Sequence, residues 1–170
     1  MSTPLLVVVP CHSGDVDQAE TLLKWCVELG NLNAHSLLIA ADSELPKERV
    51  KAMLDRVRGE FWSVRAMFVP VGVKGWPLAA NLVFRAVARQ ISEFYKGAWL
   101  WLEPDAVPLC EDWLDRLAEE YFHAPRPFMG AISDNEKPGD GLPVKYLSAI
   151  GVWPQDTFER LADLWKDPRF

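Results

Sequence analysis

Hydrophobic and polar positions divide the chain into two kinds of segment. Short, continuous apolar runs, typical of strands buried on both faces, occur at residues 5–9, 35–41, 98–102 and within 62–71. Between and after them lie longer segments in which apolar residues recur every three or four positions, which indicates amphipathic helices. Strands and helices that alternate in this way predict an α/β fold with a mainly parallel sheet, formed by a single domain over residues 1–170.

Glycines close the first three periodic segments, as expected where helices end. These helices are predicted to stop at Gly30, Gly59 and Gly97. The first begins near Asp15 or Asp17, either of which can cap its N-terminus. Beyond the fourth strand we expect a helix at 113–121, strands at 128–132 and 144–152 around a polar loop at 133–141, and a last helix through Phe158, Leu161, Leu164 and Trp165.

Composition narrows the possible partners and the cellular location. The 170 residues are 49% hydrophobic and 25% charged, which excludes a disordered chain. Lys and Arg number 18 against 24 Asp and Glu, so the net charge of -6 makes tight nucleic-acid binding unexpected. Three cysteines without C-x-x-C spacing suit a reducing cytoplasm, and no signal peptide or membrane span is evident. We therefore expect a cytoplasmic protein.

The candidate chemistry follows the predicted strands, because ligands bind at the carboxyl ends of parallel strands. Three acids and one lysine among these residues make a mixed-charge crevice, which suits Mg²⁺ or Mn²⁺ bridging to a diphosphate. The four stretches are Pro10-Cys11-His12, Asp42, Lys74-Gly75 and Glu103-Pro104-Asp105.

Each of these stretches has a functional and a structural interpretation. Glu103 and Asp105, two positions apart after an apolar strand, are predicted to point to the same side and share a cation; alternatively, Asp105 caps a turn and Glu103 is a solvated strand end. Asp42 suits a nucleobase imide or a ribose hydroxyl, or it caps the segment that opens at Ser43. Lys74-Gly75 precedes a helix N-terminus, where phosphate is favoured.

Several other sites are disfavoured. The sequence contains neither a P-loop nor a G-x-G-x-x-G fingerprint, and its three histidines lack zinc-ligand spacing. Cys11 and His12 are adjacent on an extended chain and face opposite ways, which argues against covalent catalysis. Trp99, Trp101 and Trp113 are expected in the core. Trp76 and Trp153, each beside a proline, are candidates for packing on a sugar or base.

The order of these pieces resembles the GT-A type glycosyltransferases of the nucleotide-diphospho-sugar transferase superfamily. Residues 8–12 (VVPCH) look like that family's first strand, and residues 74–81 (KGWPLAAN) are similar to its G-K-x-x-A-x-N segment. Glu103-Pro104-Asp105 occupies the position of the D-x-D motif, with Glu in place of the first Asp. Residues 148–154 (SAIGVWP) are similar to the glycine-containing strand that follows the acceptor loop.

The resemblance implies a GT-A fold and a divalent-metal-dependent glycosyltransferase that uses a nucleoside-diphosphate sugar. By it, Glu103 and Asp105 hold Mn²⁺ or Mg²⁺, and Asp134 and Asp156 are the carboxylates available as the base of an inverting transfer. Trp76 and Trp153 are the candidates for contact with the acceptor. A retaining transfer requires no dedicated base. The donor-binding residues it implies are Pro10, His12, Asp42, Lys74, Gly75, Asn81, Glu103 and Asp105.

Two alternatives remain at this point. The chain ends soon after the last matching strand, which favours a noncatalytic nucleotide-sugar-binding module or a subunit whose site another chain or copy completes. A nucleotidyltransferase of related fold is the other alternative. It would need a glycine-rich basic loop after the first strand, where residues 11–15 (CHSGD) contain no Lys or Arg.

Overall fold

A six-stranded, mostly parallel sheet forms the centre of the molecule, as the sequence predicts. The computed structural model describes residues 3–73, 75, 78–134 and 145–166. The strands lie in the order β3-β2-β1-β4-β6-β5, with β1 to β4 parallel and β6 antiparallel to both of its neighbours. Their bounds are β1 Leu6–Cys11, β2 Ser36–Asp42, β3 Ser63–Val69, β4 Trp99–Trp101, β5 Met129–Asp134 and β6 Lys145–Trp153.

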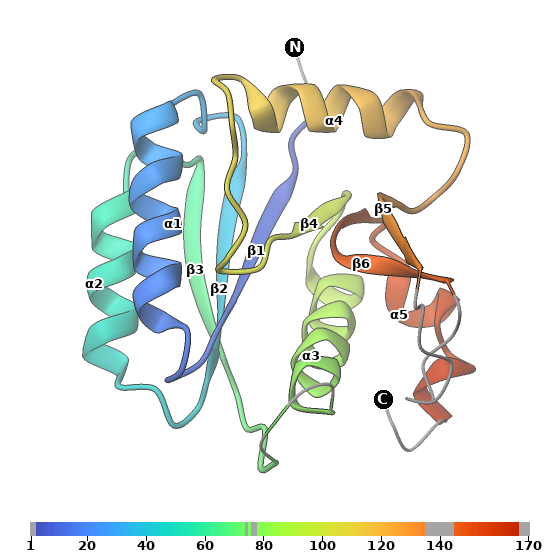
Figure 1. Ribbon diagram of the computed structural model, residues 1–170, viewed down its shortest axis with the longest axis horizontal. Coiled ribbons are helices and arrows are strands. Elements are labelled where there is room, and N and C mark those ends of the chain that lie inside the picture. The colour runs from blue at the N-terminus through green and yellow to red at the C-terminus, as the bar shows by residue number, and fades with distance from the viewer. Residues whose placement is uncertain (1–2, 74, 76–77, 135–144, 167–170) are drawn as a thin grey trace.

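Helices on both faces of the sheet create two hydrophobic layers (Figure 1). α1, α2 and α4 pack on one face, around side chains such as Val7, Ile39 and Leu100. α3 and α5 pack on the other, around Val8, Trp99 and Trp101. No helix in the described ranges is long and apolar enough to cross a membrane. The helix bounds are α1 Val16–Leu29, α2 Lys47–Val57, α3 Leu78–Phe94, α4 Trp113–His123 and α5 Thr157–Arg160.

The ends of α1 predicted from the sequence agree closely with those in the structure. Its buried side chains, Ala19, Leu22, Leu23 and Cys26, recur at helical spacing and face the sheet. Gly30 then adopts a φ of 75°, which glycine tolerates without strain, and its N–H bonds back to the carbonyls of Cys26 and Val27.

The prediction of one last helix through Phe158 and Trp165 is wrong, because this segment forms two short helical pieces. α5 ends at Arg160, and a 3₁₀ turn follows at Leu164–Lys166. In a continuous α-helix the carbonyl of Phe158 would accept the N–H of Ala162. Here the indole N–H of Trp165 donates to that carbonyl at 2.7 Å, and the Ala162 N–H bonds to Glu159 instead. The ring stacking of Phe158 on Trp165 thus accompanies the break.

His35 joins three elements at the end of the sheet where the strands β1 to β3 begin. Its side chain is fully buried, and its Nδ1 accepts the backbone N–H of Leu5 at 3.0 Å. The Nε2 therefore carries the hydrogen and donates to Asp115 of α4 at 3.1 Å. The His35 carbonyl also accepts the N–H of Trp62.

Replacing His35 with Phe is expected to destabilise the protein by about 2 kcal/mol or more, because the buried Leu5 N–H loses its acceptor. Urea unfolding followed by circular dichroism measures the change. His123→Phe is the matched control, since His123 lies exposed on the same helix that holds Asp115. Equal losses of unfolding free energy in the two variants would contradict the role of His35.

Candidate functional site

The candidate site lies where two neighbouring parallel strands end. β1 pairs with β4 so that Val8 stands opposite Trp101, and the N–H of Leu102 donates to the Val8 carbonyl at 2.9 Å. The loops that follow both strands therefore leave the sheet at the same edge. They carry His12 and Asp15 on one side and Glu103 and Asp105 on the other.

Asp15 belongs to this site, although the sequence analysis considered it only as a helix cap. It stands at the N-cap position of α1 but makes no capping hydrogen bond with its side chain. Its Oδ1 accepts the backbone N–H of His12 at 2.7 Å, and its Oδ2 lies 3.0 Å from His12 Nε2. His12 Nδ1 accepts the N–H of Gly14 at 2.9 Å, so Nε2 is the donor to Asp15. An acid three residues after a strand-end histidine was the signal in the sequence.

Asp15, Glu103 and Asp105 lie within electrostatic reach of one another. Burial raises the pKa of Glu103, the charges of Asp105 and Asp15 raise it further, and a hydrogen bond with the Trp101 side chain lowers it. Burial also raises the pKa of Asp15, and the charge of Asp105 makes a smaller contribution in the same direction. The hydrogen bond with His12 and the charge of His12 lower this pKa. Ionisation of Asp15 and Glu103 is therefore unfavourable in the folded protein, and a cation bound beside them would stabilise their charged forms.

The two acids of the Glu-Pro-Asp motif come together through a turn. β4 ends at Trp101, so the alternation of a strand does not orient Glu103 and Asp105 as the sequence analysis expected. Instead, the Ala106 N–H closes a turn on the Glu103 carbonyl at 3.0 Å. Glu103 is half-buried and Asp105 exposed, which leaves the outer carboxylate open to solvent.

Cys11 does not supply a nucleophile. Burial, together with the charge of Asp15, raises the pKa of its thiol to about 12, so the thiol stays protonated at neutral pH. Cys11 is buried while His12 is exposed, so the two side chains face opposite ways as the sequence analysis predicts.

The structure describes four of the remaining five donor candidates. Pro10 is half-buried in β1, and Asp42 ends β2, where its Oδ1 accepts the Glu44 N–H at 3.0 Å. This is the turn-capping interpretation of Asp42. Gly75 has a φ of 92° just before α3, and Asn81 is half-buried in the first turn of that helix. Lys74 and Trp76 lie outside the described residues.

The strand register places the two candidate bases, Asp134 and Asp156, at opposite edges of the sheet. Trp101 pairs with Gly151, which pairs with Gly130, so residues after Gly130 in β5 extend toward the carboxyl end of β4. Asp134 ends β5 and its backbone therefore lies at the edge that carries Glu103. β6 runs the opposite way, and Asp156 follows it at the other edge.

Asp156 and Trp153 are both engaged at that opposite edge. The carboxylate of Asp156 pairs with Arg160 at 2.7 Å, which raises the pKa of the guanidinium. The Trp153 ring stacks on Trp99 and makes edge contacts with Phe84 and Phe128. Neither residue joins the acids at the ends of β1 and β4, and the acceptor role of Trp153 stays a prediction.

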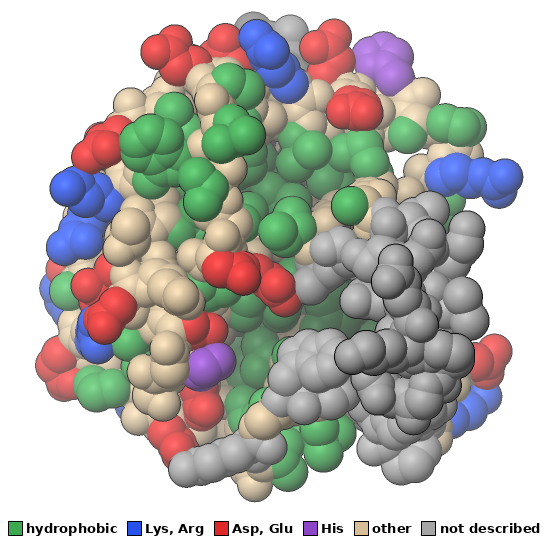
Figure 2. Space-filling view, viewed as in Figure 1, with side chains coloured by type: hydrophobic (Ala, Val, Ile, Leu, Met, Phe, Trp, Pro, Cys, Tyr) green, Lys and Arg blue, Asp and Glu red, His purple; other side chains and the backbone are tan. Residues whose placement is uncertain are grey.

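Figure 2 shows acidic side chains gathered near a histidine on one face, beside a hollow floored with hydrophobic side chains. A groove of about 610 Å³ lies between α1 and the loop after β4, and Asp17 and Asp105 line it with mainly apolar neighbours. Within the described residues, no three His, Cys, Asp or Glu side chains are arranged to hold a metal ion by themselves.

Comparison with solved structures identifies the fold as GT-A-like. The galactosyltransferase LgtC, solved with donor and acceptor sugar analogues, matches with a TM-score of 0.64 at 10% identity. The match covers 92% of this chain and 60% of LgtC. The glycosyltransferase GlyE of Streptococcus pneumoniae TIGR4 matches with a TM-score of 0.58 at 11% identity, over 98% of this chain and 39% of GlyE.

A synthetase is also among the solved structures that share this architecture. CMP:2-keto-3-deoxy-manno-octonic acid synthetase, solved with CTP, matches with a TM-score of 0.54 at 10% identity, over 96% of this chain and 78% of the synthetase. No family model and no curated protein sequence matches the chain. The chain therefore has the GT-A-like fold that the sequence analysis predicts, and it spans less than two thirds of the two glycosyltransferases.

Replacing Glu103 with Gln is expected to stabilise the folded protein at about pH 7. The raised pKa of Glu103 means that folding favours the protonated carboxyl, so its ionisation at neutral pH opposes folding. The amide removes this charge and still accepts a hydrogen bond. The gain should shrink as the pH falls toward the ordinary glutamate pKa of about 4.3, because below it the carboxyl is protonated in both states.

Chemical denaturation of both proteins at about pH 7 and about pH 4 measures the difference in unfolding free energy. Glu44→Gln, at an exposed turn position, controls for loss of one negative charge. A gain that is absent at neutral pH, or equal at the two pH values, would show that Glu103 is not held in a charge-repelling environment.

Proposed function

We propose that the chain binds a nucleoside-diphosphate sugar at the carboxyl edge of its sheet and transfers the sugar to an acceptor. The observation that carries the proposal is the convergence of Asp15, Glu103 and Asp105 at the ends of β1 and β4. A GT-A-like fold with half-buried acids at this edge suits a ligand whose diphosphate arrives with a divalent cation.

The two acids fit a cation that protein and substrate hold together. Mg²⁺ and similar ions are commonly bound by one or two carboxylates plus substrate phosphates, so a complete protein cage is not needed. Glu103 and Asp105 would supply those carboxylates, with Asp105, the more exposed of the two, as the outer ligand. Bound there, Mn²⁺ or Mg²⁺ would neutralise the negative charge that develops on the leaving diphosphate.

Register favours Asp134 over Asp156 as the base of an inverting transfer. β5 runs in the same direction as β4, so Asp134 ends its strand at the edge of the sheet that also carries the acids after β4, whereas Asp156 lies at the other edge. In this transfer the acceptor oxygen forms a bond to the anomeric carbon as its proton passes to Asp134. The bond from that carbon to the diphosphate oxygen breaks, and the electron pair leaves with the diphosphate.

The loop after β1 favours sugar transfer over nucleotidyl transfer. Residues 11–15 contribute a histidine and an aspartate there and no basic lysine or arginine that would grip a triphosphate. A noncatalytic binding module would keep the same donor site, and it is distinguished by donor binding without turnover.

Calorimetric titration with UDP-sugars and GDP-sugars tests the donor site. One donor class is expected to bind in the presence of Mn²⁺ and to lose affinity when the metal is chelated. Glu103→Gln and Asp105→Asn should remove the metal-dependent part, because each deletes a charged oxygen ligand. Asp163→Asn, which changes an exposed acid near the chain's end, is the matched control. A donor affinity that changes neither on removal of the metal nor in the Glu103→Gln and Asp105→Asn variants would contradict the proposal.

Release of the nucleoside diphosphate with water as acceptor tests the base. Asp134→Asn is expected to lower kcat by about 10²-fold to 10⁴-fold while donor affinity stays unchanged, since a general base acts on the acceptor alone. Asp156→Asn is the comparison variant. A large loss in Asp156→Asn with full activity in Asp134→Asn would overturn the assignment, and full activity in both would indicate a retaining transfer.

A further inference from the structure

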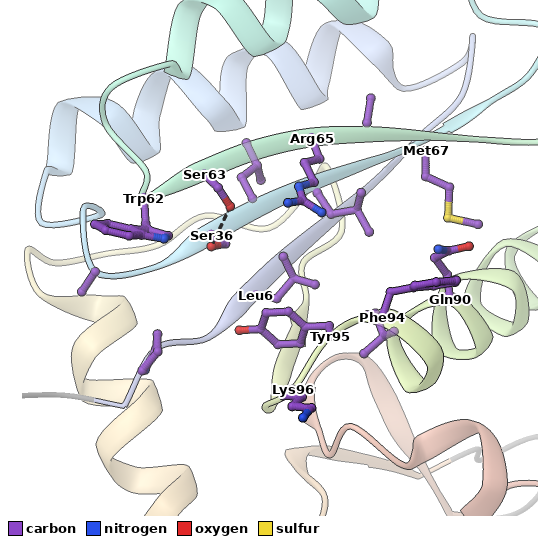
Figure 3. Close-up of a pocket in the computed structure, with 16 residues that line it drawn as sticks. Leu6, Ser36, Trp62, Ser63, Arg65, Met67, Gln90, Phe94, Tyr95 and Lys96 are labelled. Carbon is purple, nitrogen blue, oxygen red and sulfur yellow. Dashed lines mark hydrogen bonds between the residues drawn. The ribbon is translucent and has the colours of Figure 1, made fainter.

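Part of one sheet face is left open along β3, toward the end of the sheet opposite the candidate site. α2 packs against β2 and β3 on one face, whereas on the other face α3 reaches only part of β2. The result is a groove of about 750 Å³ between β3 and the last turns of α3 (Figure 3). Parallel sheets are normally covered on both faces, so the open strands lack a packing layer among the described residues.

The side chains of this groove have the composition of a protein interface. Figure 3 shows Arg65 and Met67 pointing from β3 toward Gln90 and Phe94 of α3, with Trp62 at the end of the groove where β3 begins. Trp62 is 81% exposed and Phe94 73% exposed, unusually high for aromatic side chains. Tryptophan, tyrosine, methionine and arginine are the residues that protein interfaces enrich.

The charge of the side chains that line the groove indicates which kind of partner it binds. The described residues that line the groove include Arg65 and Lys96 and no Asp or Glu, although acids outnumber bases in the chain by 24 to 18. The groove is therefore a positive, apolar strip on an acidic protein. A two-fold pair of chains meeting through this groove would place its cations near those of the copy, which disfavours a second copy as the occupant.

We infer that this groove binds an amphipathic, acidic helix of a partner protein. From Trp62 to Met67 the strand extends about 17 Å, which a helix of roughly eleven residues would span. Its apolar side chains would fill the space over Leu6 and Leu38, where α/β folds normally carry a helix. Its carboxylates would pair with Arg65 and Lys96 at the rim. The site is independent of the acids at the carboxyl edge.

Selection from a displayed library of random twelve-residue peptides, with the full chain as target, tests the inference. The enriched peptides are expected to carry Asp or Glu beside an apolar stripe at helical spacing. Fluorescence anisotropy of the best peptide should show at least a tenfold loss of affinity with Arg65→Glu. Replacing the peptide's acids with Lys should restore binding to that variant and weaken binding to the parent chain.

Phe94→Ala provides a second variant, since its exposed ring can be removed without disturbing the core, and it should also weaken binding at least tenfold. Arg126→Glu is the matched control, an exposed arginine outside the groove whose reversal should leave affinity unchanged. Failure to enrich any peptide, enrichment of basic or neutral peptides, or affinity unaffected by Arg65→Glu and Phe94→Ala would overturn the inference. So would light scattering that shows a dimer which Arg65→Glu dissociates, because a second copy would then be the occupant.

Discussion

The hydrogen bond from Leu102 to Val8 joins the end of β4 to the middle of β1, and the acidic edge of the molecule depends on that pairing. Each strand then leads into a loop with acids, and the pairing holds Asp15 within electrostatic reach of Glu103 and Asp105. Burial of the Asp15 and Glu103 carboxylates opposes folding at neutral pH, and the apolar cores on the two faces of the sheet must offset this cost. Such a cost is typical of sites that bind a counter-charge.

The two ends of the sheet have different roles in this account. At the carboxyl edge, acids follow β1 and β4 and Asp134 ends β5, and the proposed chemistry lies there. At the opposite edge, His35 ties β1 to α4, and Asp156 pairs with Arg160 next to α5. The open face of β2 and β3 adds a third surface of opposite charge. Chemistry and partner binding would therefore use separate parts of one small α/β unit.

Much of the fold was predictable because buried parallel strands and glycine-ended helices leave strong local patterns, as in β1 and at Gly30. The positions of Glu103 and Asp42 at strand ends follow from the same patterns. The pairing of Asp15 with His12 depends on the geometry of a three-residue loop, which hydrophobic periodicity does not report. The choice between Asp134 and Asp156 needed the antiparallel direction of β6, and the break after α5 needed the contact of Trp165 with Phe158.

A crystal of the full chain soaked with Mn²⁺ and UDP, measured at the manganese absorption edge, tests the central claim most directly. The account predicts one anomalous peak within about 2.3 Å of carboxylate oxygens from both Glu103 and Asp105, with the diphosphate on its open side. UDP bound at this edge with no manganese between the two acids, or a peak elsewhere in the molecule, would contradict it.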